Sequence, residues 1–407
     1  MEKIISLDLG HSESGISPEE ISAATEKIGR LPAPFFALYS PDFAAIREAA
    51  GKHSDKKNII LEGNGGSIST IRALSSCFGG DMDKNVFILD TDDPEYIAEL
   101  KRKCPVSDTL FIVINRSGNS IQTISGYLLF QEYDTVFITT EGSTLDQIGK
   151  GMGVTTYLTR AEDQPVSRYS GISEFHLIPS AIIGADIERI AQGAKEMYGL
   201  CAPDSPFSEN IALQFALHLD KLEKLGYTEI FLSIYSKRLW GFYELIIQLY
   251  HESVCKQGKG QTVYGSDAPE NQHHTLQRVN SGRRNSVAFF VTVDNYRDNF
   301  PINVPDAIKD VKCRNISVGD FGKLDAQGII KTEFEGTWKD TIEEKIPAIN
   351  LNVKEISPET AGALIAFFQY AIYYSSVLRD VNPFDQPGVE RSKEYIFQLA
   401  EEKGRRK

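Results

Sequence analysis

Short apolar runs alternate with helix-like segments along the first half of the chain. Continuous apolar runs of this length, bounded by turn residues, are typical of parallel strands that are buried on both faces. A helix-like segment follows the first run from Ile68, and a helix is expected at 122–131 between the third and fourth runs. This alternation predicts an α/β fold on a parallel sheet. The predicted strands are 58–61, 86–90, 109–114 and 135–139.

The same alternation returns in the second half. Pro203 and Pro206 lie between two predicted helices and indicate a linker. Strands and helices then alternate again, so we expect two α/β units in tandem, followed by a helical C-terminal segment. The predicted strands are 229–235 and 287–293, and the predicted helices are 181–198, 210–225 and 241–255.

Two further segments are expected to be helical. Residues 1–55 form a helical lead-in, in which Ser17 and Pro18 have the sequence of an N-cap followed by a first helical position. Residues 361–378 carry no charge and are long enough to be suspected of crossing a membrane. They also contain glutamine, tyrosine and serine, which favours a helix in the core of an α/β protein, and no membrane partner is expected.

Composition narrows the class of protein. The 407 residues are 41% hydrophobic and 24% charged, which is typical of a soluble globular chain of two or three domains. The formal net charge of −13 argues against nucleic acid as a partner. Five cysteines without CxxC spacing indicate neither a disulfide framework nor a zinc site, and the N-terminus does not resemble a signal peptide. We therefore expect a cytoplasmic protein.

Two turns that follow predicted strands are rich in glycine, serine and asparagine. They are 63–67, Gly-Asn-Gly-Gly-Ser, and 115–120, Asn-Arg-Ser-Gly-Asn-Ser. Open α/β sheets bind ligands at the carboxyl ends of their strands, and free N–H groups at a helix start can surround an anion. Neither turn is a Walker A loop or a GxGxxG motif. The turns predict a site for a small phosphate-like group, although the glycines could instead serve only to make tight turns.

The segment 382–390, Asn-Pro-Phe-Asp-Gln-Pro-Gly-Val-Glu, is the most specific motif in the chain, and Lys393 follows shortly after it. It resembles the C-terminal signature of the phosphoglucose isomerase (glucose-6-phosphate isomerase) family almost letter for letter. Other family motifs follow in the same order over about residues 60–400. They are the GGS turn at 65–67, the phosphate loop at 115–120, the Arg-Tyr-Ser stretch at 168–170, Gln248-Leu249 with Glu252-Ser253, and Gln272-His273 with Gln277 and 282–284.

The resemblance implies a fold and an assembly. The family has two tandem SIS-type (sugar isomerase) domains, which are flavodoxin-like α/β sandwiches, and a helical tail that carries active-site residues. We place the first domain at 56–200, the second at 201–370 and the tail at 371–407. The resemblance also implies a homodimer, in which each active site takes its histidine from the other subunit.

The resemblance further implies an aldose–ketose isomerase that interconverts glucose 6-phosphate and fructose 6-phosphate by ring opening and proton transfer through a cis-enediol. Glu252 matches the family's base, His273 its ring-opening histidine, Lys393 a second ring-opening partner, and Arg168 the arginine that stabilises the enediolate. No cofactor is needed because the hydrogen never leaves as hydride. The pair His273-His274 lacks the companions of a metal site, so we expect none.

The substrate-binding residues that the resemblance implies depart from the family pattern in the loop 115–120. Asn115-Arg116-Ser117 stands where the family usually has Ser-Lys-Thr, which exchanges an ammonium for a planar guanidinium. An alternative is therefore an isomerase of another sugar with an anionic C6 group, such as sulfoquinovose. A third hypothesis is a non-catalytic SIS protein that senses a sugar phosphate, but its DNA-binding partner domain has no basic footprint in the first 40 residues. The implied residues are Gly66, Ser67, Asn115, Arg116, Ser117, Ser120 and Gln386.

Overall fold

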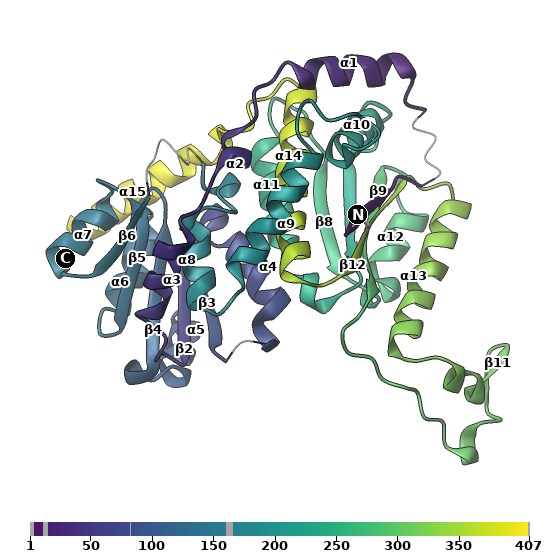
Figure 1. Ribbon diagram of the computed structural model, residues 1–407, viewed down its shortest axis with the longest axis horizontal. Helices are drawn as coiled ribbons and strands as arrows, with labels where there is room; N and C mark the ends of the chain where they lie inside the picture. The colour runs from purple at the N-terminus through teal and green to yellow at the C-terminus, as the bar shows by residue number, and fades with distance from the viewer. Residues whose placement is uncertain (1–3, 11–14, 82, 160–165, 406–407) are drawn as a thin grey trace.

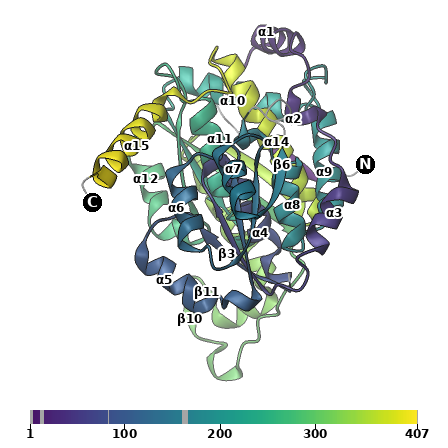
Figure 2. The same cartoon turned by 90° about the vertical axis from the view of Figure 1, so that its left-hand side faces the viewer.

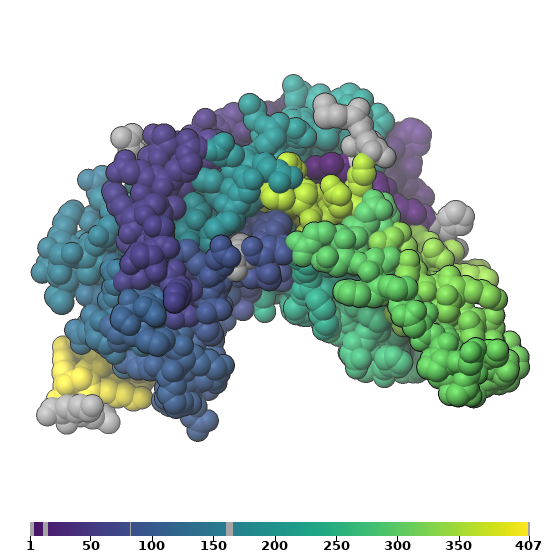
Figure 3. Space-filling view, turned by 60° about the horizontal axis from the view of Figure 1, so that its bottom comes forward, coloured from purple at the N-terminus to yellow at the C-terminus, as the bar shows by residue number. Residues whose placement is uncertain are grey.

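The computed structural model describes residues 4–10, 15–81, 83–159 and 166–405. Two lobes, each built on a five-stranded sheet, lie on either side of a group of long helices (Figure 1). The space-filling view shows a hollow between the two lobes on one face (Figure 3). The predicted α/β fold with parallel sheets is confirmed.

The first sheet is entirely parallel, with strand order β3-β2-β4-β5-β6. The chain turns from β2 to one side for β3 and then crosses to the other side for β4, so a topological switch point lies between β2 and β4. Gly63 at the end of β2 pairs with Ile114 near the end of β4, which brings the turns after these strands together. The strands are β2 (Asn58–Gly63), β3 (Asn85–Leu89), β4 (Thr109–Asn115), β5 (Asp134–Thr140) and β6 (Thr155–Thr159).

The second sheet has the order β1-β12-β9-β7-β8 and is parallel except for β1. The lead-in is therefore not wholly helical, because β1 pairs antiparallel with β12 at the sheet edge. Residues 1–3 and 11–14 of the lead-in lie outside the described residues. The strands are β1 (Ile5–Asp8), β7 (Glu229–Ile234), β8 (Thr262–Asp267), β9 (Ser286–Asn295) and β12 (Ala348–Glu355).

Three long helices fill the space between the sheets: α9 (Ile187–Leu200), α10 (Ile211–Lys224) and α14 (Pro358–Leu378). α14 is the apolar segment that was expected in the core, and 89% of its apolar window is buried inside the molecule. A Cβ atom on Gly362 of α14 would lie 1.8 Å from the Ile190 carbonyl oxygen, and one on Gly193 of α9 would lie 1.8 Å from the Glu359 carbonyl oxygen. The backbones of α9 and α14 are therefore in direct contact, which only glycine permits.

Other helices lie around the sheets. The helix predicted at 181–198 is wrong in its start, because α8 ends at Ile182 and α9 begins after the N-cap Asp186. Gly184 between them has φ +101°, a conformation that ends a helix. The remaining helices are α1 (Pro18–Gly29), α2 (Phe35–Leu38), α3 (Phe43–Gly51), α4 (Ser69–Phe78), α5 (Pro94–Lys103), α6 (Ile121–Leu129), α7 (Thr144–Met152), α8 (Glu174–Ile182), α11 (Phe242–Ser253), α12 (Thr275–Ser281) and α13 (Ala326–Glu343).

The lead-in begins its first helix as the sequence predicts. Ser17 caps α1 in a capping box with Glu20, and Pro18 occupies the first helical position. At the other end, α14 runs without interruption through residue 371, where the tail was expected to begin. The tail proper is the segment after Leu378, which leads to α15 (Glu390–Arg405).

Two segments extend away from the body of the molecule. One is the arm 296–325, which carries the short hairpin β10 (Lys312–Cys313) and β11 (Ile316–Ser317) at the lower right of Figure 1. The other is α15, which projects from the side of the molecule in Figure 2 and has no buried residue. Both carry exposed apolar side chains, namely Phe300, Ile308, Val311, Ile316 and Leu324 on the arm and Tyr395, Ile396, Phe397 and Leu399 on α15.

Candidate active site

The glycine-rich turn after β2 is in close contact with two other segments. Gly65 has φ +53°, and a Cβ atom there would lie 2.8 Å from Nε2 of Gln248 on α11. A Cβ atom on Gly66 would lie 2.5 Å from the backbone nitrogen of Arg168. Both glycines are thus required because other groups approach the turn closely. The turn, which continues as the 3₁₀ helix Gly65–Ser67, therefore lies directly against Arg168 and close to Glu252, the two charged residues of the candidate site.

Glu252 lies at the C-terminal end of α11, the helix that follows β7 of the second sheet. Its carboxyl receives a hydrogen bond from Gln248 Nε2 to Oε1 at 3.1 Å, one helical turn earlier. Arg168 Nη1 donates to the other oxygen, Oε2, also at 3.1 Å. The Glu252 side chain remains 28% exposed, so one face of the carboxylate is open to a ligand.

Arg168 holds three segments of the chain together. Its side chain is only 2% exposed, and its guanidinium donates to Glu252, to Ser253 Oγ at 3.1 Å and to Gln386 Oε1 at 3.3 Å. Nη2 donates to the carbonyl oxygens of Pro383 at 2.7 Å and Asp385 at 2.9 Å. A buried guanidinium is stable only when its donors are satisfied in this way. Arg168 therefore fixes the signature segment 382–386 against Glu252.

Lys256 anchors the same segment from its other side. Its ammonium forms an ion pair with Asp385 Oδ1 at 2.6 Å, donates to the Asp385 carbonyl oxygen at 2.7 Å and also donates to the carbonyl oxygen of Asn382. Burial lowers the pKa of Lys256, while the contact with Asp385 opposes that shift. The ion pair in turn lowers the pKa of the Asp385 carboxyl. Two cations thus surround the backbone of the signature segment.

The loop 115–120 follows β4, next to the turn after β2. Asn115 is buried and organises the loop, because its Oδ1 accepts from the Gly118 N–H at 2.8 Å and from Ser117 Oγ at 3.0 Å. Its Nδ2 donates to Thr123 Oγ1 at 2.8 Å, which ties the loop to the first turn of α6. Ser120 is the N-cap residue of α6. Arg116 is partly buried, and this burial lowers the pKa of its guanidinium. The loop thus brings a guanidinium, hydroxyls and a helix start to the carboxyl edge of the sheet.

His176 connects the turn at Gly66 to the segment at Ser170. Its Nε2 lies 2.9 Å from the Gly66 carbonyl oxygen and its Nδ1 lies 3.0 Å from the Ser170 carbonyl oxygen. Burial lowers the pKa of His176 to about 4, so the ring is neutral and donates to one of the two carbonyls at a time. This buried histidine links the GGS turn to the Arg168 stretch.

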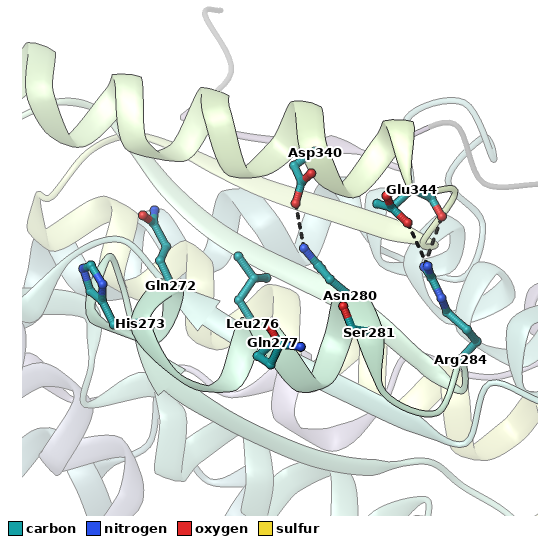
Figure 4. A pocket seen from close by; sticks show the side chains of 9 residues that line it. All are labelled: Gln272, His273, Leu276, Gln277, Asn280, Ser281, Arg284, Asp340 and Glu344. Carbon is teal, nitrogen blue, oxygen red and sulfur yellow. Dashed lines mark hydrogen bonds and ion pairs between the residues drawn. The ribbon is translucent and has the colours of Figure 1, made fainter. Parts of the chain in front are cut away.

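The structure does not bring the other two predicted catalytic residues to this place within one chain. His273 is exposed at the end of a 3₁₀ helix and lines one end of a groove of about 670 Å³ between α12 and α13 (Figure 4). Lys393 lies on α15 and pairs with Glu390 at 2.9 Å. Among the described residues, neither forms a hydrogen bond or ion pair with Glu252 or Arg168. Figure 4 shows that contacts of Asn280 with Asp340 and of Arg284 with Glu344 connect the two sides of the groove away from His273.

The site therefore unites Gly66, Arg168, Glu252 and Gln386 by direct contact, with Ser67 in the same turn and the 115–120 loop on the neighbouring strand. Sequence reasoning missed Lys256 as a supporting group. It named Gln248 and Ser253 in a family motif but gave them no role. The spacing of Gln248 four residues before Glu252 on one helix could have revealed the role of Gln248. Ser253 accepts from both Arg168 and Tyr169. In the described residues no group of three or more His, Cys, Asp or Glu is placed to hold a metal ion.

Solved structures share the fold of this chain. The chain superposes on the crystal structure of a hypothetical protein from Thermus thermophilus with a TM-score of 0.84, 22% identity, and coverage of 95% of this chain and 96% of that one. It superposes on a glucose-6-phosphate isomerase from Chlamydia trachomatis with a TM-score of 0.79, 18% identity, and coverage of 98% and 89%. The fold is that of the SIS-type sugar isomerases.

A family model described as phosphoglucose isomerase matches residues 54–406, and the chain therefore belongs to the phosphoglucose isomerase family. It is 28% identical over 395 residues to a probable glucose-6-phosphate isomerase of Haloarcula marismortui, with 92% of this chain and 87% of that protein covered. It is 27% identical to the glucose-6-phosphate isomerase of Enterococcus faecalis, with 88% and 84% covered. The chain is thus an enzyme of the isomerase class.

Proposed function

We propose that this enzyme interconverts glucose 6-phosphate and fructose 6-phosphate by moving a proton between C1 and C2 of the open-chain sugar. The observation that carries the proposal is the half-open Glu252 carboxylate, held between Gln248 and the buried guanidinium of Arg168 at the carboxyl edge of the first sheet. A carboxylate that is fixed but accessible can take a proton from one carbon and return it to its neighbour. The family and the names of its curated relatives support the same reaction.

Arg168 is placed to stabilise the negative charge that develops in this reaction. Removal of a proton from C2 places negative charge on the carbonyl oxygen of the substrate, and a preorganised guanidinium stabilises that charge without having to reorient. Nη1 lies on the same side as Glu252 Oε2 and Gln386 Oε1, which it contacts at 3.1 and 3.3 Å. All five N–H groups of the guanidinium have partners, and the contact of Nη1 with Gln386 Oε1 is the longest of them at 3.3 Å. Nη1 would therefore reach the substrate oxygen by exchanging this contact for one with the substrate.

The anionic end of the sugar is assigned to the first lobe. Ser67, Arg116, Ser117 and Ser120 supply hydroxyls and a guanidinium at adjacent strand ends, and the start of α6 supplies backbone N–H groups. Gln386 borders this region through its contact with Arg168. The two α/β units, 56–200 and 201–370, would then have different tasks, since the first holds the anion and the second contributes the base.

A second copy of the chain is proposed to complete the site. His273 forms no contact with Glu252 within one chain in the described part of the molecule, and ring opening needs a group that can exchange a proton near neutral pH. The arm 296–325 and α15 both present apolar side chains to solvent, which is typical of surfaces that pack against another subunit. We therefore assign His273 of each subunit to the site of its partner in a homodimer of the cytoplasm, and Lys393 to ring opening beside it.

A direct comparison of substrates tests the proposal. Purified protein is given glucose 6-phosphate or sulfoquinovose, and the ketose product is followed. We expect turnover of glucose 6-phosphate. Turnover of the sulfonate alone would show that the altered loop 115–120 selects another anionic group, and would overturn the proposed substrate while leaving the isomerisation intact.

The role of the base is tested by Glu252→Gln, which keeps the shape of the side chain and removes the proton acceptor. We expect kcat to fall by about 10²–10⁴-fold with little change in affinity for sorbitol 6-phosphate, which has no carbonyl group. Glu244→Gln on the exposed side of the same helix is the matched control and should retain activity. Near-normal proton exchange at C2 in Glu252→Gln would exclude this residue as the base.

A further inference from the structure

The Glu62 carboxyl occupies an unusual place in the first lobe. It lies at the end of β2, between Leu89 of β3 and Val113 of β4, at the topological switch point of the sheet. It is only 1% exposed, and neither of its oxygens forms a hydrogen bond of ordinary geometry with the described residues. A buried carboxyl without an ion-pair partner costs stability, so its presence beside the two anion-binding turns calls for a role.

The packing around Glu62 leaves space for this side chain and directs it to α6. A Cβ atom on Gly126 of α6 would lie 3.2 Å from Glu62 Cγ and 3.7 Å from Oε1, so a larger residue at 126 would press on the carboxyl. Thr123, one turn earlier on α6, acts on the same carboxyl through its hydroxyl. Thr123 Oγ1 already accepts a hydrogen bond from Asn115, which leaves its own proton to be donated.

A row of polar groups therefore leads from Glu62 to the loop 115–120. The Thr123 hydroxyl acts on the Glu62 carboxyl without a hydrogen bond of ordinary geometry, and Thr123 Oγ1 accepts from Asn115 Nδ2 at 2.8 Å. On the far side of the same amide, Asn115 Oδ1 holds the Gly118 N–H and Ser117 Oγ. Because an amide group has a fixed arrangement of donor and acceptor, a group that fixes Nδ2 also fixes the side of Asn115 that shapes the loop.

We propose that Glu62 is a positioning residue for substrate binding, which acts through Thr123 and Asn115 to hold the loop 115–120 in the shape that receives the anionic end of the sugar. This inference rests on the proposed function for the identity of the ligand, but the coupling to the loop does not. Glu62 does not touch the substrate, so its effect is on affinity rather than on proton transfer.

The proposed role requires that the Glu62 carboxyl is neutral. Burial raises its pKa to about 8, with the hydroxyl of Thr123 opposing the shift and the negative charge of Asp92, in the turn after β3, adding to it. β3 and β4 carry no titratable side chain, α6 carries only Tyr127, and the loop carries Arg116. The carboxyl is therefore neutral at pH 7. Its ionisation at higher pH would place a negative charge beneath the anion site.

Kinetics of four variants test the inference. With glucose 6-phosphate as substrate, Glu62→Leu should raise KM about tenfold or more while kcat changes much less, because a polar support of the binding loop is lost. Thr123→Val should have a similar effect, and the double variant should be little worse than either single one because both act through the same row of polar groups. Asp220→Asn removes a buried carboxyl in the other lobe and should leave KM unchanged. Additive effects, or a loss confined to kcat, would overturn the inference.

Two readouts keep the inference falsifiable if Glu62→Leu does not fold. In wild type KM should rise above about pH 8, and Glu62→Gln should abolish that rise because its amide does not ionise. Hydrogen exchange of the ligand-free protein at the Gly118 amide should also be faster in Glu62→Ala, which removes the polar group beside Thr123, than in Glu62→Gln, which keeps an acceptor there. If wild type fails to turn over glucose 6-phosphate but the loop exchange still responds, the proposed function fails and this inference stands. An unchanged exchange rate together with an unchanged pH profile overturns it.

Discussion

At the scale of single residues, the site depends on a few side chains that are buried at a cost in stability. Arg168 is a guanidinium with 2% exposure whose donors all go to other parts of the site. Glu62 is a carboxyl with no ion-pair partner among the described residues. Such groups are concentrated where a protein binds or transforms a ligand, because function and not stability accounts for them.

The burial of Glu62 predicts a dependence of stability on pH. Below about pH 4.5 both the folded and the unfolded chain carry the protonated group, so it has no effect on the free energy of unfolding. Between pH 4.5 and 8 the unfolded chain loses the proton while the folded chain keeps it, so wild type is destabilised by up to ~1.4 kcal/mol per pH unit. Glu62→Gln removes this penalty.

Urea unfolding at pH 5 and pH 8 checks the prediction. The gap in unfolding free energy between Glu62→Gln and wild type should grow by a few kcal/mol from the lower to the higher pH. The same pH dependence in both proteins would show that the carboxyl ionises in the folded state as it does in water.

The site residues differ in how far the sequence could reveal them. Glu252, Arg168 and Gln386 were found because they belong to family motifs, and the structure brings them within hydrogen-bond distance. Glu252 alone could not be distinguished from other glutamates by its surroundings in the sequence. Glu62 was not found at all, because a single acidic residue at the end of an apolar run has no periodic signal and its burial depends on α6, which is distant in the chain.

At the scale of elements, strands with a continuous apolar run were found, and those with a short or more polar sequence were missed. β2, β4, β5, β7 and β9 are covered on both faces and have continuous apolar sequences, so their positions were found to within a few residues, and the edge strand β3 was found from the same kind of run. β1, β6 and β8 lie at sheet edges and are short or polar, and they were missed. β12 was missed as well, although it is internal and largely buried, because Asn350 and Asn352 interrupt its apolar run. The pairing of β1 with β12 joins segments more than 300 residues apart, as the register Ile5↔Val353 shows, and no local pattern encodes it.

The contact between α9 and α14 predicts a sharp difference between two glycines of one helix. Gly193→Ala would place a Cβ atom 1.8 Å from the Glu359 carbonyl oxygen, whereas a Cβ atom on Gly199 meets nothing within 4 Å. We expect Gly193→Ala to lower the free energy of unfolding by about 3 kcal/mol, because the helices must move apart. Gly199→Ala on the same helix should be neutral or slightly stabilising. Thermal or urea unfolding measures both, and equal effects would contradict the close packing.

At the scale of the whole molecule, the chain leaves surfaces that a single copy does not cover. α15 has no buried residue, and its tyrosine, phenylalanine and aliphatic side chains face solvent. The arm 296–325 also extends from the second lobe (Figure 1). A sequence predicts such segments as ordinary helix or loop, because their partner is not encoded in neighbouring residues. The assembly had to be inferred from the family.

Mixing of subunits tests the shared site. Homodimers of Glu252→Gln and of His273→Ala should each be nearly inactive. If the two proteins are unfolded together and refolded in equal amounts, half of the dimers are mixed, and each mixed dimer has one site with both Glu252 and His273 intact. Recovered activity should approach about a quarter of wild type. No recovery, with dimers confirmed by light scattering, would place both residues in one chain's site.

The direct backbone contact of α9 with α14 has a mechanical consequence. These helices join the half of the molecule that carries the turns after β2 and β4 to the half that carries Glu252, and carbonyl groups seated against glycine leave no layer of side chains that could slide. The two halves therefore resist movement relative to each other. The distance between Glu252 and these turns is thus set when the chain folds.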